Sequence, residues 1–116
     1  MPHPKYILKS THDDRYHFNL TARNGHIILT SQTYLTKSSA IKGIESVQIN
    51  SLIQSQYIRN TASNGLFYFD LKASNGIVIG TSEMYASLES RETGIESVKR
   101  NGQIAEVDDQ TLLKVF

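Results

Sequence analysis

The sequence predicts an α+β fold built from two tandem copies of one unit. The pentapeptide Gly-Ile-Glu-Ser-Val at residues 43–47 returns at residues 94–98, and at this 51-residue offset 18 of the 45 residues from 6 to 50 are identical to their counterparts. Each copy contains a stretch in which apolar and polar residues alternate, as in a half-buried strand. Each then changes to a helical period. The chain is therefore a tandem duplication.

The first half of each copy is predicted to be a run of antiparallel strands. Residues 5–10 form the first strand, and a polar turn at residues 12–14 leads into the second. In the second strand every other residue is apolar and faces the core: Tyr16, Phe18, Leu20 and Ala22 in one copy, Phe67, Phe69, Leu71 and Ala73 in the other.

An Asn-Gly pair follows each second strand and predicts a hairpin with a two-residue type I′ turn. The pairs are Asn24-Gly25 and Asn75-Gly76. A two-residue loop would place Ala22 opposite Ile27 and Leu20 opposite Leu29 on the core face. The same register would put Ile28 and its copy Ile79 on the other face.

A helix is predicted next, with Thr36 and Ser87 as N-caps. It should run to about Asn50 in the first copy, and to Asn101 with Gly102 as C-cap in the second. Gly43 and Gly94 fall in the middle of the buried stripe, where a glycine costs about 1 kcal/mol relative to alanine. We expect these glycines to allow close backbone approach.

The remainder of each copy is short. Residues 52–53 and 103–104 continue the register and could supply a fourth strand. We expect one domain over residues 1–116, with repeat one at 5–55 and repeat two at 56–109. Residues 110–116 form a tail whose apolar end, 112–116, either docks on the domain or frays.

The order of these motifs, found twice, resembles the YegP-like family of small bacterial tandem-repeat proteins of unknown function. Its repeat signature is carried here by Asn24, Gly25, Tyr34, Gly43, Asn75, Gly76, Tyr85 and Gly94. The resemblance implies two β3-α-β repeats that form one continuous antiparallel sheet, with exchanged C-terminal strands and both helices packed on one face. It implies no activity and no catalytic residue.

The amino-acid composition limits the classes of function that this chain is expected to have. Twelve Lys and Arg against eleven Asp and Glu give a net charge of +1, well below the basic excess typical of nucleic-acid binding. The chain has no cysteine, no signal peptide and no apolar run long enough to span a membrane, so we expect a soluble cytoplasmic protein. Because the duplication can stand in for a dimer, we expect a monomer.

An enzyme is not predicted. The four histidines lie in or before the first repeat and have no histidine counterparts in the second, which does not support a symmetric metal site. Glu45 and Glu96 fall on outer helix faces, where Glu96 can pair with Arg100. We therefore expect no catalytic, cofactor-binding or metal-binding residues and no cofactor.

Two function hypotheses remain. The first is an interaction or accessory module that binds a protein or a small ligand. Its candidate surface is the open face of the sheet, represented by Ile28, Thr30, Ile79, Thr81 and Tyr68. The alternative is weak nucleic-acid binding through that face and the basic residues of repeat two, namely Arg59, Lys72, Arg91, Lys99 and Arg100.

Overall fold

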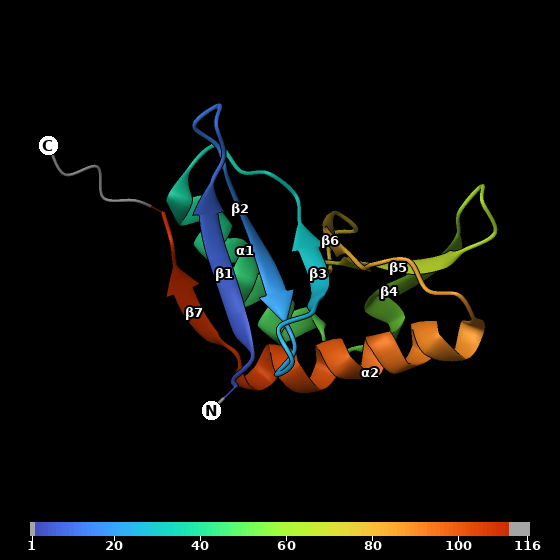
Figure 1. Cartoon of the computed structure of the whole chain (residues 1–116). Coiled ribbons are helices and arrows are strands. Elements are labelled where there is room, and N and C mark those ends of the chain that lie inside the picture. Colours follow the sequence, from blue (N-terminus) through green and yellow to red (C-terminus); the bar gives the residue numbers. More distant parts are fainter. Residues whose placement is uncertain (1, 112–116) are drawn as a thin grey trace, which may run out of the picture.

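The computed structural model describes residues 2–111 and joins the two repeats in one seven-stranded sheet with two helices (Figure 1). Its elements are β1 Lys5–Ser10, β2 Tyr16–Thr21, β3 Ile27–Ser31, α1 Lys37–Asn50, the 3-10 turn η1 Gln54–Gln56, β4 Tyr57–Thr61, β5 Phe67–Lys72, β6 Val78–Thr81, α2 Leu88–Ile104 and β7 Glu106–Asp109. The predicted α+β fold with two repeats is confirmed.

The strand order is β4-β5-β6-β3-β2-β1-β7. The repeats meet where β3 pairs antiparallel with β6, Thr30 opposite Thr81 and Ser31 opposite Gly80. Every neighbouring pair is antiparallel except β1 and β7, which run parallel, so the sheet is mixed. Each helix contacts strands of both repeats; in Figure 1, α1 lies behind β1 and β2.

One C-terminal strand is exchanged between the repeats, because β7 of repeat two pairs with β1 of repeat one. The prediction of a strand at residues 52–53 is wrong, since the chain passes there through a turn and η1 directly into β4. Residues 103–104 belong to α2, and β7 begins two residues later. Residues 112–116, the predicted docked or frayed tail, lie outside the described residues.

Gly102 is not the C-cap of α2, because the helix continues through it to Ile104. The hydroxyl of Tyr6 donates a hydrogen bond to the carbonyl oxygen of Gly102 at 2.7 Å. In the other repeat Tyr57 makes the same bond to Ser51, also at 2.7 Å. The first strand of each repeat therefore anchors the helix end of the other, and burial raises the pKa of Tyr6 and Tyr57.

The Asn-Gly hairpins do not have the predicted two-residue type I′ turn. Gly25 adopts φ 85° and donates to the carbonyl of Ala22, and Ala22 in turn pairs with His26. The loop thus has three residues, with glycine alone at positive φ. Asn24 instead closes the turn by accepting from the amide of His26 at 3.0 Å. The second repeat repeats this geometry around Gly76.

The longer loop brings a β-bulge with it. The pairing of Leu20 with Leu29 is confirmed, but the next pair is Thr21 with Ile27, which leaves Ile28 without a partner. Repeat two has the same bulge at Ile79. The extra residue turns toward the helices, so Ile28 and Ile79 are only 8% and 5% exposed. The prediction that these isoleucines lie on the open face is wrong.

Close approach at Gly43 and Gly94 is confirmed, but the group that comes against the helix backbone is a tyrosine side chain. A Cβ atom on Gly43 would lie 2.3 Å from the hydroxyl oxygen of Tyr34, and one on Gly94 would lie 2.2 Å from that of Tyr85. The tyrosine rings are held in place because Tyr34 stacks on Phe18 and Tyr85 on Phe69. Thr36 and Ser87 are the predicted N-caps.

Candidate functional site

Two equivalent grooves lie on the helix side of the sheet, each between the helix of one repeat and the Asn-Gly hairpin of the other. The α1 groove, about 390 Å³, is lined by Gln32, Thr33, Tyr34, Ser39, Lys42, Gly43, Ser46, Ala73, Asn75, Ile77, Val78 and Ile79. The α2 groove, about 450 Å³, is lined by Ala22, Asn24, His26, Ile28, Tyr85, Ser87, Glu89, Ser90, Thr93, Gly94 and Ser97.

The two groove linings share nine equivalent positions. Seven of these nine positions carry the same residue in both grooves, and Lys42 against Thr93 and Ile77 against His26 differ. Part of this likeness is structural, because Asn24 closes its turn and Gly43 makes room for Tyr34.

The hydroxyls of Tyr34 and Tyr85 lie against Gly43 and Gly94, the helix glycines that line the same grooves. Backbone hydrogen bonds fix these two tyrosines beside Tyr16 and Phe67, the first residues of β2 and β5. Unlike the hydroxyls of Tyr6 and Tyr57, theirs make no hydrogen bond within residues 2–111. Burial raises the pKa of Tyr34 and Tyr85, so both hydroxyls remain protonated near neutral pH.

The helix walls of the grooves carry serines that are already oriented. Ser46 accepts a hydrogen bond from the side-chain amide of Asn50 at 3.1 Å, and Ser97 accepts one from Asn101 at 3.0 Å. The lining of each groove thus combines an oriented serine, a tyrosine and the apolar Ile28 or Ile79. Such a concave apolar surface with a few polar groups is typical of small-molecule sites.

Sequence reasoning missed these grooves, although it singled out several of their residues as structural signature. The available signal was the identity of Tyr34 with Tyr85 and of Ser46 with Ser97. What could not be read from one repeat is that its helix faces the hairpin of the other. That placement follows from the β3–β6 junction and the shared sheet.

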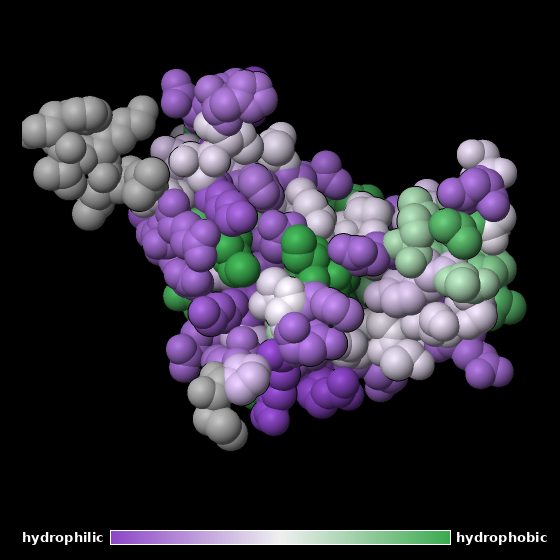
Figure 2. Space-filling view, in the orientation of Figure 1, coloured by the Kyte–Doolittle hydropathy of each residue, from purple (hydrophilic) through white to green (hydrophobic). Residues whose placement is uncertain are grey.

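The open face of the sheet holds the other predicted candidates, Thr30, Thr81 and Tyr68. Thr30 and Thr81 face each other across the repeat junction. Thr30 accepts from the side chain of Asn19 at 2.9 Å, and Thr81 donates to Asp70 at 2.5 Å. Figure 2 shows that the face over β1, β2 and β3 is mainly hydrophilic, with small hydrophobic patches. A working role for this face stays a prediction.

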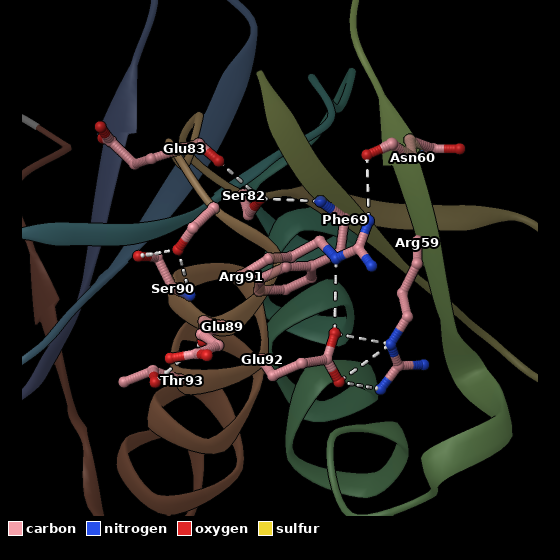
Figure 3. Close-up of polar contacts among 11 residues, drawn as sticks. Arg59, Asn60, Phe69, Ser82, Glu83, Glu89, Ser90, Arg91, Glu92 and Thr93 are labelled. Atoms are coloured by element: carbon pink, nitrogen blue, oxygen red, sulfur yellow. Dashed lines mark hydrogen bonds and ion pairs between the residues drawn. The ribbon is translucent and has the colours of Figure 1, made fainter. Parts of the chain in front are cut away.

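Apart from Lys72 of β5, the basic residues named for repeat two have their contacts on or around α2. Arg59 makes a bidentate pair with Glu92 of α2, with distances of 2.7 and 2.8 Å (Figure 3). This pairing holds the pKa of the Glu92 carboxyl below its usual range. Arg91 reaches the carbonyl of Asn60 at 3.3 Å and lies over the ring of Phe67. These contacts fasten α2 to β4.

Lys99 and Arg100, the last basic residues of this set, have different surroundings. Lys99 pairs with Glu96 at 3.2 Å and with the side chain of Gln54 at 2.6 Å. The predicted pair of Glu96 with Arg100 is therefore wrong, because the carboxylate turns to Lys99. Arg100 instead lines a hollow with Arg23, at one end of the α2 groove.

Among residues 2–111, no three His, Cys, Asp or Glu side chains gather in a way that could hold a metal ion. Within the same part of the chain, no helix has the length and apolarity needed to cross a bilayer.

Comparison with known proteins identifies close relatives. The family model described as a domain of unknown function, DUF1508, matches residues 12–57 and again residues 62–109, one match for each repeat. The UPF0339 protein YegP of Escherichia coli K12 is 53% identical over 106 residues, which cover 91% of this chain and 96% of that protein. A UPF0339 protein of Shewanella oneidensis is 47% identical over the same length, with the same coverage.

Solved structures share the fold. The solution structure of YegP from E. coli, described as a protein of unknown function, superposes with a TM-score of 0.89 at 50% identity, covering 96% of each chain. The solution structure of the Shewanella oneidensis protein gives a TM-score of 0.90 at 46% identity, covering 98% of this chain and 96% of that one.

Proposed function

This chain belongs to the DUF1508 family, and from its grooves we propose that it is an accessory binding module that holds a small organic ligand without transforming it. The resemblance to YegP-like proteins that the sequence indicates is confirmed. The names of these relatives assign no activity, so the proposal rests on the geometry of this chain.

One observation carries the proposal: each of two equivalent grooves is lined by a tyrosine whose hydroxyl has no hydrogen-bond partner within residues 2–111. A half-buried phenol normally finds a hydrogen-bond partner. Tyr34 and Tyr85 are held rigidly by stacking, and glycines at positions 43 and 94 let the hydroxyls reach the helix backbone. Such preorganised donors would contribute to affinity without ordering cost on binding.

Binding is favoured over catalysis because burial raises the pKa of Tyr34 and Tyr85, which makes their hydroxyls hydrogen-bond donors and poor nucleophiles. We further propose that the module acts as a monomer in the cytoplasm, as expected from the sequence. The junction of β3 with β6 supports the monomer, since it joins the repeats within one chain.

The test is an NMR screen of the ¹⁵N-labelled protein with a library of small amides, sugars, nucleosides and organic acids. Binding should shift the amide signals of Gly43 and Ser46, or of Gly94 and Ser97. The matched variant Tyr34→Phe/Tyr85→Phe keeps both rings and both stacks but removes the hydroxyls. We expect it to bind the same compounds at least about tenfold more weakly.

Two outcomes would contradict the proposal. One is a screen in which no compound moves the groove amides. The other is binding that survives unchanged in the double phenylalanine variant, because the hydroxyls would then play no part.

A further inference from the structure

We propose that the α2 groove ends in an anion site, in which Arg23 and Arg100 hold the phosphate group of a small phosphorylated ligand. This inference rests on the proposed function, because it names the class of ligand for one of the two grooves. The site itself is a hollow of about 530 Å³ between the hairpin of repeat one and the last turns of α2.

The first support is the charge of the hollow. Arg23 and Arg100 come from different repeats and line the same space, and neither makes an ion pair within residues 2–111. No carboxylate is among the residues that line it. Two guanidinium groups at an uncompensated site favour a doubly charged anion, and their planar forks suit bidentate contacts with phosphate oxygens.

The carboxylate that could have neutralised Arg100 is engaged elsewhere. Glu96 lies four residues before Arg100 on α2, the spacing at which a helical ion pair would form. It binds Lys99 instead, and Lys99 also binds Gln54 in the segment before β4. The contacts around Glu96 therefore leave Arg100 available to a ligand.

Continuity with the α2 groove gives the size of the ligand. Ala22, Asn24 and Ser97 line both the hollow and the groove, so the two spaces adjoin. A phosphate between Arg23 and Arg100 would let the organic part of the same molecule pass Ser97 toward the hydroxyl of Tyr85. The combined space suits a small phosphorylated molecule.

The other repeat supplies a built-in comparison. At the 51-residue offset, Arg23 corresponds to Ser74 and Arg100 to Ile49, whose side chain is 67% exposed. The lining of the α1 groove contains a single basic residue, Lys42, at a position that corresponds to Thr93. The two grooves thus share a scaffold but differ in charge at this end, and only the α2 groove is expected to bind phosphate.

Inorganic phosphate and pyrophosphate are the probes, titrated into the ¹⁵N-labelled full chain at fixed ionic strength. We expect saturable shifts of the Arg23 and Arg100 side-chain signals and of the Asn24 and Ser97 amides. Arg23→Gln/Arg100→Gln should weaken binding by about tenfold or more. Arg15→Gln removes another exposed arginine, which pairs with Asp13, and should change phosphate binding less than about twofold.

A gain of function provides a second test. Ser74→Arg/Ile49→Arg places both arginines at the equivalent end of the α1 groove and should create a second phosphate site there. Equal binding by the wild-type protein and by Arg23→Gln/Arg100→Gln would overturn the inference, as would a linear response spread over all surface lysines. A citrate titration that matches phosphate would assign the site to carboxylates and would also overturn it.

These results are separable from the test of the grooves. Tyr34→Phe/Tyr85→Phe leaves both arginines in place and should still bind inorganic phosphate. If Tyr34→Phe/Tyr85→Phe no longer binds small ligands while Arg23→Gln/Arg100→Gln still binds phosphate, the groove proposal is supported and the anion site is refuted. The opposite pattern supports the anion site alone.

Discussion

The phenol of Tyr85 occupies the space that a side chain at position 94 would need. A methyl group there would lie 2.2 Å from the hydroxyl oxygen and 2.5 Å from the ring carbon that bears it. The ring cannot move aside easily, because it stacks on Phe69 with a centroid separation of 6.3 Å. Steric exclusion therefore opposes the intrinsic preference of a helix for alanine.

We predict that Gly94→Ala destabilises the protein. Overpacking costs about 1–3 kcal/mol, whereas the gain in helix propensity is about 1 kcal/mol. Urea denaturation measures the difference. In a Tyr85→Ala background the obstruction is gone, and the same Gly94→Ala change should stabilise by up to about 1 kcal/mol. A higher free energy of unfolding for Gly94→Ala alone would contradict the close-approach explanation.

Among the elements, the exchanged strand β7 is held by ion pairs at its C-terminal end. Lys37, the first residue of α1, contacts Asp109 at 2.5 Å, and Lys5 of β1 lies 3.8 Å from Asp108. Lys37 and the side chain and amide of Thr111 hold the pKa of the Asp109 carboxyl at about 2. A strand from repeat two is thus fixed by lysines of repeat one.

We predict that Lys37→Met raises the pKa of Asp109 toward its ordinary value of about 3.9. In the wild-type protein a depressed pKa stabilises the fold above the unfolded-state value, and this contribution is lost as the pH falls toward 2. A ¹³C NMR titration of the carboxyl group reports the midpoint directly. Lys42→Met, at an exposed lysine of the same helix, is the control. An unchanged midpoint in Lys37→Met would show that the contact is not made in solution.

The elements also show where prediction from the sequence stops. Alternation and caps predicted the strands and the start of each helix, because these depend on neighbours in the sequence. The prediction for the hairpin was wrong by one residue. The loop has three residues, Arg23, Asn24 and Gly25, instead of the predicted two, and the extra residue brings a bulge with it. That bulge moved Ile28 from the expected open face into the core. The parallel pairing of β7 with β1 was not predicted either. The direction of a strand relative to a partner far away in the sequence depends on the path of the chain between them, which local patterns do not give.

In the whole molecule, each repeat completes the other. Tyr6 of repeat one binds Gly102 of repeat two, and Tyr57 of repeat two binds Ser51 of repeat one. Each groove combines a helix with the hairpin of the opposite repeat. The resemblance predicted the shared sheet, whereas the grooves could not be predicted, since they exist only between the repeats.

We predict that the intact chain is a monomer in sedimentation experiments and that neither half folds alone as one. Residues 1–53 lack the β7 partner of β1 and the strands β5 and β6 that α1 contacts. Mixing residues 1–53 with residues 54–116 should restore a cooperative unfolding transition. A well-dispersed NMR spectrum from a monomeric 1–53 fragment at micromolar concentration would refute the mutual dependence.

The parallel pairing of β1 and β7 also determines how the molecule resists mechanical unfolding. A force that pulls residues 2 and 111 apart acts along these two neighbouring strands in opposite directions. The backbone bonds between them, from Pro4 with Glu106 to Leu8 with Gln110, would then be strained together, whereas the bonds of a peeled hairpin open one after another. All of these hydrogen bonds would have to break together when the chain is pulled from its two ends. We therefore expect the mechanical resistance to unfolding to be greatest in that direction.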